Sequence, residues 1–400
     1  MAIIQGANSL IDVSQAHIDG CLYTGPATLL FAQQLCKWGA RVRIPATLNS
    51  ISIDRGRWVV QGIKASLAEP AGQLADAYVE MGARPTYTCA PYLLDSAPAS
   101  GAQVVWAESN AVVYANSVLG ARTMKYPDYL DICIALTGRA PNAGCHIKSN
   151  RQARIAISVP PVSNADDALF PLLGYVVGDI AASRIPLVTG LEATPISNDN
   201  LKAFGAAFAT TSSAPMFHVA GITPEASTAV DQARHLSSST STVALAHDDL
   251  VMAWRKLDSG ASTTVDLVAL GNPHASYTEL AQLAALCSSC TKSPNVALVV
   301  TCGRETYERA ASDGFIDTLA AFGAQIITDT CWCMISEPVI SPQAKTIMTN
   351  SGKYAHYGAG LTGRSMRFGS MEGCVRAACG EEVEKVVPEW LGGGGDDDGR

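Results

Sequence analysis

The C-terminal part of the chain repeats one pattern. A short apolar run ends abruptly in a polar, glycine-rich or cysteine-bearing loop, and a segment with helical apolar spacing follows. Alternating strands and helices favour parallel strands joined by right-handed crossovers, so the sequence predicts an α/β fold. In such sheets, ligands bind outside the carboxyl ends of the strands. Here those ends carry Cys, His, Asn, Lys and Glu, and we interpret as strands the runs 264–270, 295–300, 325–328, 345–349 and 366–369.

The N-terminal part alternates in the same way but less regularly. Residues 27–38 have helical spacing before a glycine, and residues 41–45 resemble a strand. Residues 71–81 and 85–89 form a second helix–strand pair, whereas the Gly- and Ala-rich middle of the chain is harder to assign. We predict an N-terminal α/β unit (1–158), a middle α/β subdomain (159–260), a C-terminal α/β unit with the site loops (261–391) and a disordered tail (392–400).

Composition limits the class of protein. A chain of 400 residues with 48% hydrophobic and 16% charged content can bury most of its surface without disulfides or a structural metal. The net charge of −8 gives no support for nucleic-acid binding. Residues 1–20 lack the features of a secretory signal, and the longest uncharged stretch, 203–224, is broken by Gly and Pro. We therefore expect a cytoplasmic protein with no membrane role.

Twelve cysteines in a reducing compartment are expected to be thiols rather than disulfides. Cys89, Cys302, Cys331 and Cys374 each follow a predicted strand, where a side chain can reach a shared crevice. Three thiolates from distant loops would suit an iron–sulfur cluster that keeps one iron open as a Lewis acid. The alternative, that all twelve are buried or inert thiols, stays open at this point.

The segment Cys331-Trp332-Cys333 offers two sulfurs as possible metal ligands. If the segment is extended, its two sulfurs differ in reach toward one metal, so we expect one ligand from this pair.

Motifs for dinucleotide binding, for phosphate binding by a P-loop and for a serine nucleophile elbow are missing from the sequence. Polar candidates near the predicted strand ends are His17, Thr47, Asn49, Glu108, Ser109, Asn110, His146, His218, Asn272, His274 and Lys353.

Ten short segments, in order from residue 16 to 375, together resemble the large-subunit part of the aconitase X family within the aconitase superfamily. They cover nearly the whole chain, so their combination is specific although each is short. The segments are AHIDGCLYTGPA (16–27), IPATLNS (44–50), TCAPYL (88–93), WAESNAVVYANSVLGART (106–123), ALTGRAPNAGCH (135–146), HVAGITPEA (218–226), LGNPHAS (270–276), DTCW (329–332), TNSGKYAHY (349–357) and FGSMEGCV (368–375).

This resemblance implies an aconitase-like architecture of several units and an iron–sulfur-dependent dehydratase, a hydro-lyase. It implies a [2Fe-2S] or [4Fe-4S] cluster held by Cys89, Cys331 and Cys374, with Cys302 as the substitute ligand. The residues in matching motifs that are expected to line the substrate crevice are His17, Thr47, Asn49, Ser109, Asn110 and Lys353.

The resemblance also implies a small hydroxy acid as the substrate. The stretch TGRAPNAGCH (137–146) is closer to members that convert cis-3-hydroxy-L-proline to Δ1-pyrroline-2-carboxylate, and mevalonate 5-phosphate is the alternative substrate. Fused members carry a smaller swivelling domain whose serine-rich loop supplies the catalytic base. No such loop occurs in these residues, so we expect a separate small subunit to bring the base. A metal-free thiol racemase and a non-catalytic binding subunit are the competing interpretations.

Overall fold

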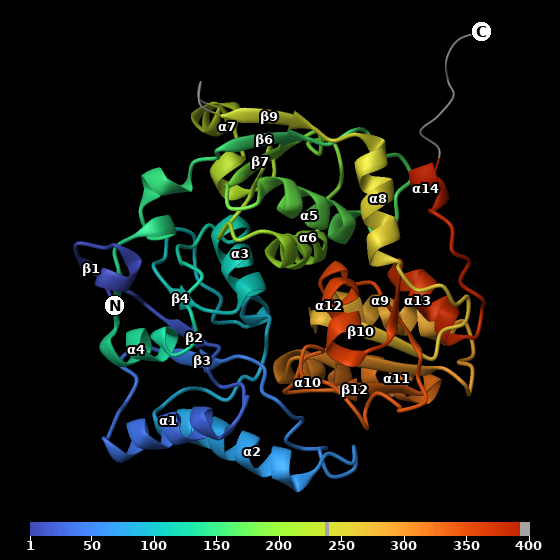
Figure 1. Ribbon diagram of the computed structural model, residues 1–400, viewed down its shortest axis with the longest axis horizontal. Helices are drawn as coiled ribbons and strands as arrows, with labels where there is room; N and C mark the ends of the chain where they lie inside the picture. The colour runs from blue at the N-terminus through green and yellow to red at the C-terminus, as the bar shows by residue number, and fades with distance from the viewer. Residues whose placement is uncertain (237–239, 393–400) are drawn as a thin grey trace.

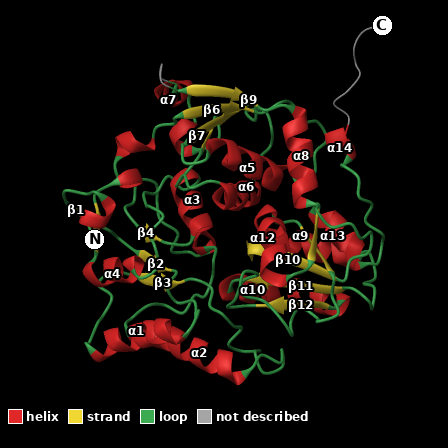
Figure 2. Cartoon of the chain, viewed as in Figure 1, coloured by secondary structure: helices red, strands yellow, loops and turns green. Residues whose placement is uncertain are grey.

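The computed structural model describes residues 1–236 and 240–392, which form three α/β units around separate sheets (Figure 1). The tail predicted to be disordered lies, from residue 393 on, outside the described residues. Helices cover the sheets and long loops connect the units (Figure 2). No helix in the described part of the chain is both long and apolar enough to cross a membrane.

The first unit is built on a three-stranded parallel sheet of order β3-β2-β4. The predicted helix at 27–38 is confirmed as α1, while the strand expected at 41–45 lies at β3 instead and 85–89 forms no strand. The small antiparallel pair β1-β5 closes this unit. Its elements are β1 Leu10–Asp12, β2 Ala16–Ile18, α1 Pro26–Lys37, β3 Ala46–Leu48, α2 Ala65–Glu80, β4 Val105–Trp106, α3 Ser109–Ser117, α4 Leu130–Thr137 and β5 Arg139–Pro141.

The middle unit has a four-stranded parallel sheet of order β8-β7-β6-β9. The boundary expected at residue 158 falls at the end of β6, so the first expected unit included a strand of this sheet. Helices α5 and α6 pack so closely that a Cβ on Gly174 would lie 2.1 Å from the Phe204 carbonyl oxygen. The elements are β6 Ile155–Ser158, α5 Leu169–Ala181, β7 Pro186–Thr189, α6 Asn198–Thr211, β8 His218–Val219, α7 Ala229–His235, β9 Ser241–Ala244 and α8 His247–Leu257.

The C-terminal unit has a five-stranded sheet of order β12-β11-β10-β13-β14, parallel throughout, as the sequence predicted. From β10 the chain proceeds outward through β11 and β12 on one side, and β13 and β14 fill the other side. This reversal makes a topological switch point between β10 and β13, the usual position of a ligand crevice. The elements are β10 Leu267–Ala275, α9 Tyr277–Ser288, β11 Ala297–Cys302, α10 Arg304–Ser312, α11 Phe315–Phe322, β12 Ala324–Ile327, β13 Thr346–Thr349, α12 Gly352–Thr362, β14 Ser365–Phe368 and α13 Met371–Ala378.

A bulge at Gly271 shapes the end of the central strand β10. Gly271 has φ of 86°, and a Cβ there would lie 2.1 Å from the Thr301 carbonyl oxygen, so this position requires glycine. The register against β11 shifts between Leu270 and Ala275. Short helical elements complete the chain: 3₁₀ turns at Ile3–Gln5, Pro91–Leu93, Gly144–His146, Lys148–Arg151 and Pro224–Ala226, and α14 at Glu389–Gly392.

Candidate active site

Polar side chains of the first unit gather where β2 and β3 end. His17 and Thr47 are register partners in the parallel sheet, and the His17 Nδ1 and Thr47 Oγ1 atoms are 2.8 Å apart. Asn49 follows β3, Asp19 follows β2, and the Asn49 amide donates a hydrogen bond to the Asp19 carboxylate. Burial lowers the pKa of His17 to about 4, although Glu108 opposes the shift, so His17 is neutral at pH 7.

A buried ion pair joins the first unit to the C-terminal unit. Glu108 is the N-cap of α3, and Lys353 lies in the first turn of α12 at the carboxyl end of β13. The Lys353 Nζ atom is 2.9 Å from a Glu108 oxygen, which also accepts a hydrogen bond of 2.6 Å from the Asn110 amide. Burial alone would raise the pKa of Glu108, but Lys353 and Asn110 outweigh it and the pKa is lowered. Both members of the pair are therefore charged.

Three thiols converge beside this ion pair. Cys331 makes side-chain contacts with both Cys333 and Cys89. The contact with Cys333 lowers the pKa of Cys331, but the contact with Cys89 together with burial outweighs it and raises the pKa to about 12. The positive charge of Lys353 favours the thiolate forms of Cys331 and Cys333. The segment is a turn, closed by the Met334 amide donating to the Cys331 carbonyl oxygen at 2.9 Å, and this turn is why the two sulfurs lie together.

Hydrogen-bond donors reach the thiol group from the bulged end of β10. The His274 backbone amide donates to the Cys89 sulfur at 3.3 Å, and the Asn272 side-chain amide approaches the Cys333 sulfur at 4.0 Å. The His274 ring connects the two cysteine loops, because its Nδ1 atom lies 3.1 Å from Thr88 Oγ1 and its Nε2 atom 2.8 Å from the Thr330 carbonyl oxygen. A small cavity of about 30 Å³ adjoins this point, lined in part by Asn272, Asn350 and Ser351.

Carboxylates accumulate on the first-unit side of the site. Burial raises the pKa of Asp19 well above its ordinary value, and the neighbouring charges of Glu108, Asp128 and Asp131 raise it further. The Asp131 carboxylate accepts hydrogen bonds from the backbone amides of Asp19 at 2.7 Å and of Gly20 at 3.2 Å. These contacts lower its pKa, but burial dominates and raises it to about 6.

A second lysine, Lys125, lies within electrostatic range of the ion pair. Lys125, on the loop before α4, donates a hydrogen bond of 2.9 Å from Nζ to the Ser212 carbonyl oxygen, just beyond α6 of the middle unit. Burial lowers the pKa of Lys125 to about 8, while Glu108 raises it and Lys353 lowers it further. All three units therefore contribute to the surroundings of this site.

The remaining strand-end cysteines lie apart from the thiol group. Cys374 is fully buried on α13 after the edge strand β14, and burial and then Asp167 and Asp166 raise its pKa well above the ordinary value. Cys302, at the end of β11, is buried in the same hydrophobic cluster, and its pKa rises to about 12 through burial. The structure thus brings Cys333, rather than Cys374 or Cys302, into contact with Cys331, which also contacts Cys89. The predicted ligand set stays a prediction.

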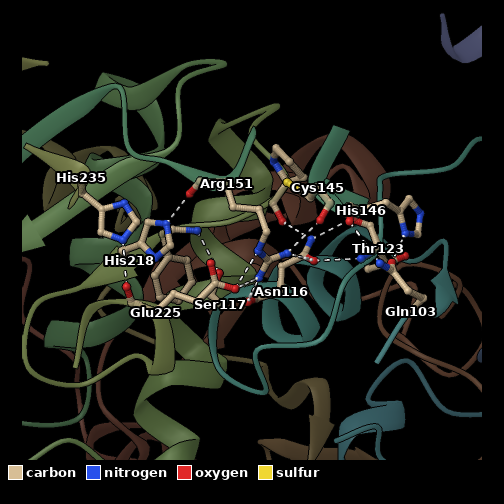
Figure 3. A network of polar contacts seen from close by, with 12 residues as sticks. Gln103, Asn116, Ser117, Thr123, Cys145, His146, Arg151, His218, Glu225 and His235 are labelled. Atoms are coloured by element: carbon tan, nitrogen blue, oxygen red, sulfur yellow. Dashed lines mark hydrogen bonds and ion pairs between the residues drawn. The ribbon is translucent and has the colours of Figure 1, made fainter. Parts of the chain in front are cut away.

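Two of the candidate histidines belong to a different network, between the first and middle units (Figure 3). Its centre is Arg151, which is almost fully buried and lies 2.7 Å from Glu225. The Arg151 carbonyl oxygen is 2.7 Å from His218 Nε2, and His146 Nδ1 is 2.6 Å from Gln103 Oε1. These histidines therefore join two units and do not take part in the site.

Most of the expected crevice residues do meet. His17, Thr47, Asn49, Asn110 and Lys353 lie in the contacts described above, and Ser109 is the half-buried first residue of α3, next to Glu108. Sequence reasoning missed the site residues Asp19, Lys125, Asp128 and Asp131, and it expected only one of Cys331 and Cys333 to take part. Asp19 had a usable signal, because it lies two residues after the candidate His17. Lys125 and Asp128 had none, since they lie on an irregular loop.

Family models match the chain in three consecutive parts. The aconitase X first domain matches residues 1–149, the second domain matches 153–255 and the third domain matches 265–380. The holo-form crystal structure of Thermococcus kodakaraensis aconitase X superimposes with a TM-score of 0.83 and 28% sequence identity, covering 94% of this chain and 92% of that one.

Curated relatives fall into two groups. Cis-3-hydroxy-L-proline dehydratases of Hypocrea jecorina and Pseudomonas aeruginosa are 56% and 54% identical over 98% of this chain. The chain spans 66% and 67% of the lengths of these two relatives. The phosphomevalonate dehydratase large subunit of Methanothermobacter thermautotrophicus is 33% identical over 90% of this chain and 87% of its own length.

Proposed function

The chain belongs to the aconitase X family, and from this premise we propose that it is the large-subunit part of an iron–sulfur-dependent dehydratase that acts on cis-3-hydroxy-L-proline. The observation that carries the proposal is the convergence of three thiols and a buried Lys353–Glu108 ion pair at a topological switch point. The product would be Δ1-pyrroline-2-carboxylate, formed by loss of the α-proton and the 3-hydroxyl group.

The donor set suits an iron–sulfur cluster better than a single ion. Among residues 1–236 and 240–392, no group of three or more His, Cys, Asp or Glu side chains surrounds one metal position. In a cluster, different thiolates bind different irons, so they need not surround one point. Cys89, Cys331 and Cys333 would hold the group, with amides of His274 and Asn272 directed at two of the sulfurs. Hydrogen bonds to sulfur are among the features that tune such clusters.

When bound, the cluster would supply a Lewis acid for the departing hydroxyl group. The chain's own residues would hold the substrate in place and set the protonation state of the site. Neutral His17, held by Thr47, presents an imidazole that can donate or accept one hydrogen bond. Lys353 keeps a positive charge next to the thiols and opposes the rise in the pKa of Cys331 and Cys333, whereas Glu108 adds to that rise at Cys333.

The charges of the site favour an amino acid over a phosphorylated substrate. The carboxyl groups of Asp19, Asp128 and Asp131 lie near the Lys353–Glu108 pair, and burial raises the pKa of all three. A phosphate group carries about two negative charges at pH 7, and these carboxyl groups would offer it no compensating positive charge. Cis-3-hydroxy-L-proline carries a ring ammonium that these carboxyl groups can neutralise. The identities of 56% and 54% with hydroxyproline dehydratases support the same choice.

We also propose that a further element completes the site and supplies the base that removes the α-proton. The hydroxyproline dehydratases have about a third of their length outside the match, and the relative of similar length is called a large subunit. Adding a candidate small subunit to the chain is expected to raise turnover. Full turnover by these 400 residues alone would contradict this part of the proposal.

Anaerobic purification followed by iron, sulfide and activity analysis tests the function. We expect bound iron and sulfide, and cyclic imine formation from cis-3-hydroxy-L-proline but not dehydration of mevalonate 5-phosphate. Active protein without iron would favour a thiol racemase, and iron-free protein that is inactive even with the small subunit would favour a binding role. Dehydration of mevalonate 5-phosphate alone would overturn the assignment of cis-3-hydroxy-L-proline as the substrate.

Single cysteine-to-serine replacements test the ligand set. Cys89→Ser and Cys331→Ser are expected to lose most of the iron and the visible absorbance. Cys333→Ser and Cys374→Ser distinguish the two candidates for the third ligand. The contacts in the structure favour a loss of iron in Cys333→Ser. Cys302→Ser is the matched buried control, and it is expected to keep its iron.

A further inference from the structure

Lys202 is a buried lysine of the middle unit that contacts the C-terminal unit. It lies in the second turn of α6, and its side chain is 3% exposed. Its ammonium group pairs with the Glu279 carboxylate of α9, and the Asp199 carboxylate lies 3.8 Å away. The Lys202 Nζ atom also donates a hydrogen bond of 3.2 Å to the His274 carbonyl oxygen. A cation of the middle unit is therefore bound to the bulged end of β10.

The bulged end of β10 is a segment that needs such support. The register against β11 shifts between Leu270 and Ala275, so the residues between them leave the regular ladder. Glu279 is tied to the same segment, because its carboxylate accepts the Ser276 amide at 2.8 Å and its own amide donates to the Ser276 hydroxyl at 3.1 Å. The ion pair thus holds the backbone on both sides of Ala275.

His274 is the residue through which this segment reaches the thiols. Its amide donates to the Cys89 sulfur at 3.3 Å. Its ring lies between Thr88 Oγ1 at 3.1 Å and the Thr330 carbonyl oxygen at 2.8 Å. These contacts are all with the two cysteine loops, whereas Lys202 holds the His274 backbone from a different unit. A hydrogen bond from a charged donor is stronger than one between neutral groups, so this hold is a firm one.

We propose that Lys202 is a positioning residue, which holds the His274 backbone so that its amide faces the Cys89 sulfur. The contacts of Lys202 are with Glu279, Asp199 and His274, so it acts on the thiols through His274. An amide directed at a sulfur stabilises the electron-rich form of an iron–sulfur cluster, so the same contact would raise the reduction potential of the proposed cluster. That consequence rests on the proposed function, whereas the hold on His274 does not.

Hydrogen–deuterium exchange of the full chain, resolved to single residues, tests the hold on His274 directly. Lys202→Met is expected to speed exchange of the His274 amide by about 10-fold or more, the change that corresponds to one hydrogen bond from a charged donor. The strand β7, Pro186–Thr189, should keep its exchange rates, because the middle unit stays folded. Lys202→Arg keeps the charge and the donors and is expected to exchange like the wild type. Lys256→Met, at an exposed lysine of α8 in the same unit, is the matched control.

A double variant separates positioning from charge. Redox titration of the anaerobically purified full chain is expected to give a more negative reduction potential in Lys202→Met, but loss of a positive charge alone would have the same effect. The variant Lys202→Met, Glu279→Gln removes both charges of the pair. A potential that stays as low as in Lys202→Met, with equally fast exchange at His274, supports positioning. A return to the wild-type potential would show that charge alone acts and would overturn the proposal.

The outcomes also separate this inference from the proposed function. Unchanged exchange at His274 in Lys202→Met, or exchange that rises equally at His274 and in β7, would overturn the role of Lys202 and leave the dehydratase proposal standing. Wild-type protein without iron and sulfide would refute the proposed cluster, and the exchange measurement would still decide the role of Lys202. If Lys202→Met does not fold, the double variant takes its place in both tests. If the double variant does not fold either, Lys202 serves folding and the proposal fails.

Discussion

At the scale of single residues, the Lys353–Glu108 pair dominates the site, because both side chains are largely removed from water and each depends on the other. Side-chain exposure is 14% for Lys353 and 15% for Glu108. Removing one partner of such a pair leaves an uncompensated charge, which costs far more than the pair contributes. The pair also links α3 to α12, and hence the first unit to the C-terminal unit.

Glu108→Gln is therefore expected to lower the free energy of unfolding by about 3 kcal/mol and to reduce kcat/KM by about 100-fold or more. Urea unfolding and steady-state assays measure the two effects. Glu305→Gln removes one partner of an exposed pair, with Arg84 at 3.3 Å, and should cost at most about 1 kcal/mol.

The double variant Glu108→Gln, Lys353→Met checks the cause of that loss. It removes both charges, so it should recover part of the stability that Glu108→Gln loses, while activity stays low. A double variant less stable than Glu108→Gln would show that the cost does not come from the unpaired lysine.

At the scale of elements, the loop from β12 to the Cys331–Cys333 turn is held by Asp329. Asp329 has φ of 68°, a conformation that few residues other than glycine adopt. Its carboxylate receives hydrogen bonds of 2.5 and 2.6 Å from Arg304, and its carbonyl oxygen accepts the Ile51 amide at 2.7 Å. One residue thus sets the direction of the cysteine turn and attaches it to the first unit.

Asp329→Ala is expected to destabilise the protein by about 2 kcal/mol or more and to lower its iron content, because the turn loses its support. Asp329→Asn tolerates the positive φ and should lose less. Thermal unfolding and iron analysis distinguish the two variants. Asp313→Asn, at an exposed aspartate bonded to Tyr277, is the matched control. Full iron content in Asp329→Ala would contradict the supporting role.

Helices and strands were predictable where the local sequence pattern determines them. The C-terminal strands and helices were correct because apolar periodicity, glycine caps and parallel topology agree there. The first-unit strands were misplaced, since β3 and β4 are only a few residues long and their pairing depends on distant partners. The expectation of one ligand from Cys331 and Cys333 applied to an extended segment, and nothing local shows that Asp329 and the Met334 amide bend it into a turn. Lys125 and Asp128 reach the site only through tertiary packing.

At the scale of the whole molecule, buried neutral histidines make stability depend on pH. Burial lowers the pKa of His146 to about 4 and of His218 to about 3, against an ordinary value near 6.5. The unfolded chain therefore binds more protons below about pH 6.5, and stability is lost as the pH falls from there toward the folded values. Both histidines lie in the network around Arg151, so the seam between the first and middle units carries part of the effect (Figure 3). Burial lowers the pKa of His17 and of His274 to about 4, so these two residues of the candidate site add to it.

Between pH 7 and pH 5, each of His146 and His218 is expected to cost about 2 kcal/mol of unfolding free energy. Urea unfolding at both pH values measures the total change, and comparison with a histidine variant gives the share of one residue. His218→Gln should lower stability at pH 7 but reduce the further loss at pH 5. If the difference between the two pH values is the same in His218→Gln as in the wild type, His218 is not its source.

The cysteines that meet beside the switch point between β10 and β13 are far apart in the sequence, and this separation has a consequence for biosynthesis. Cys89 leaves the ribosome long before Cys331 and Cys333, and at typical elongation rates the delay is on the order of tens of seconds. During that time the first unit can fold with its cysteine loop unfinished, because the His274 amide and the cysteine turn that complete it do not yet exist. Insertion of the proposed cluster would therefore be a late event in the life of the chain, because Cys89 alone of its three proposed ligands is present early.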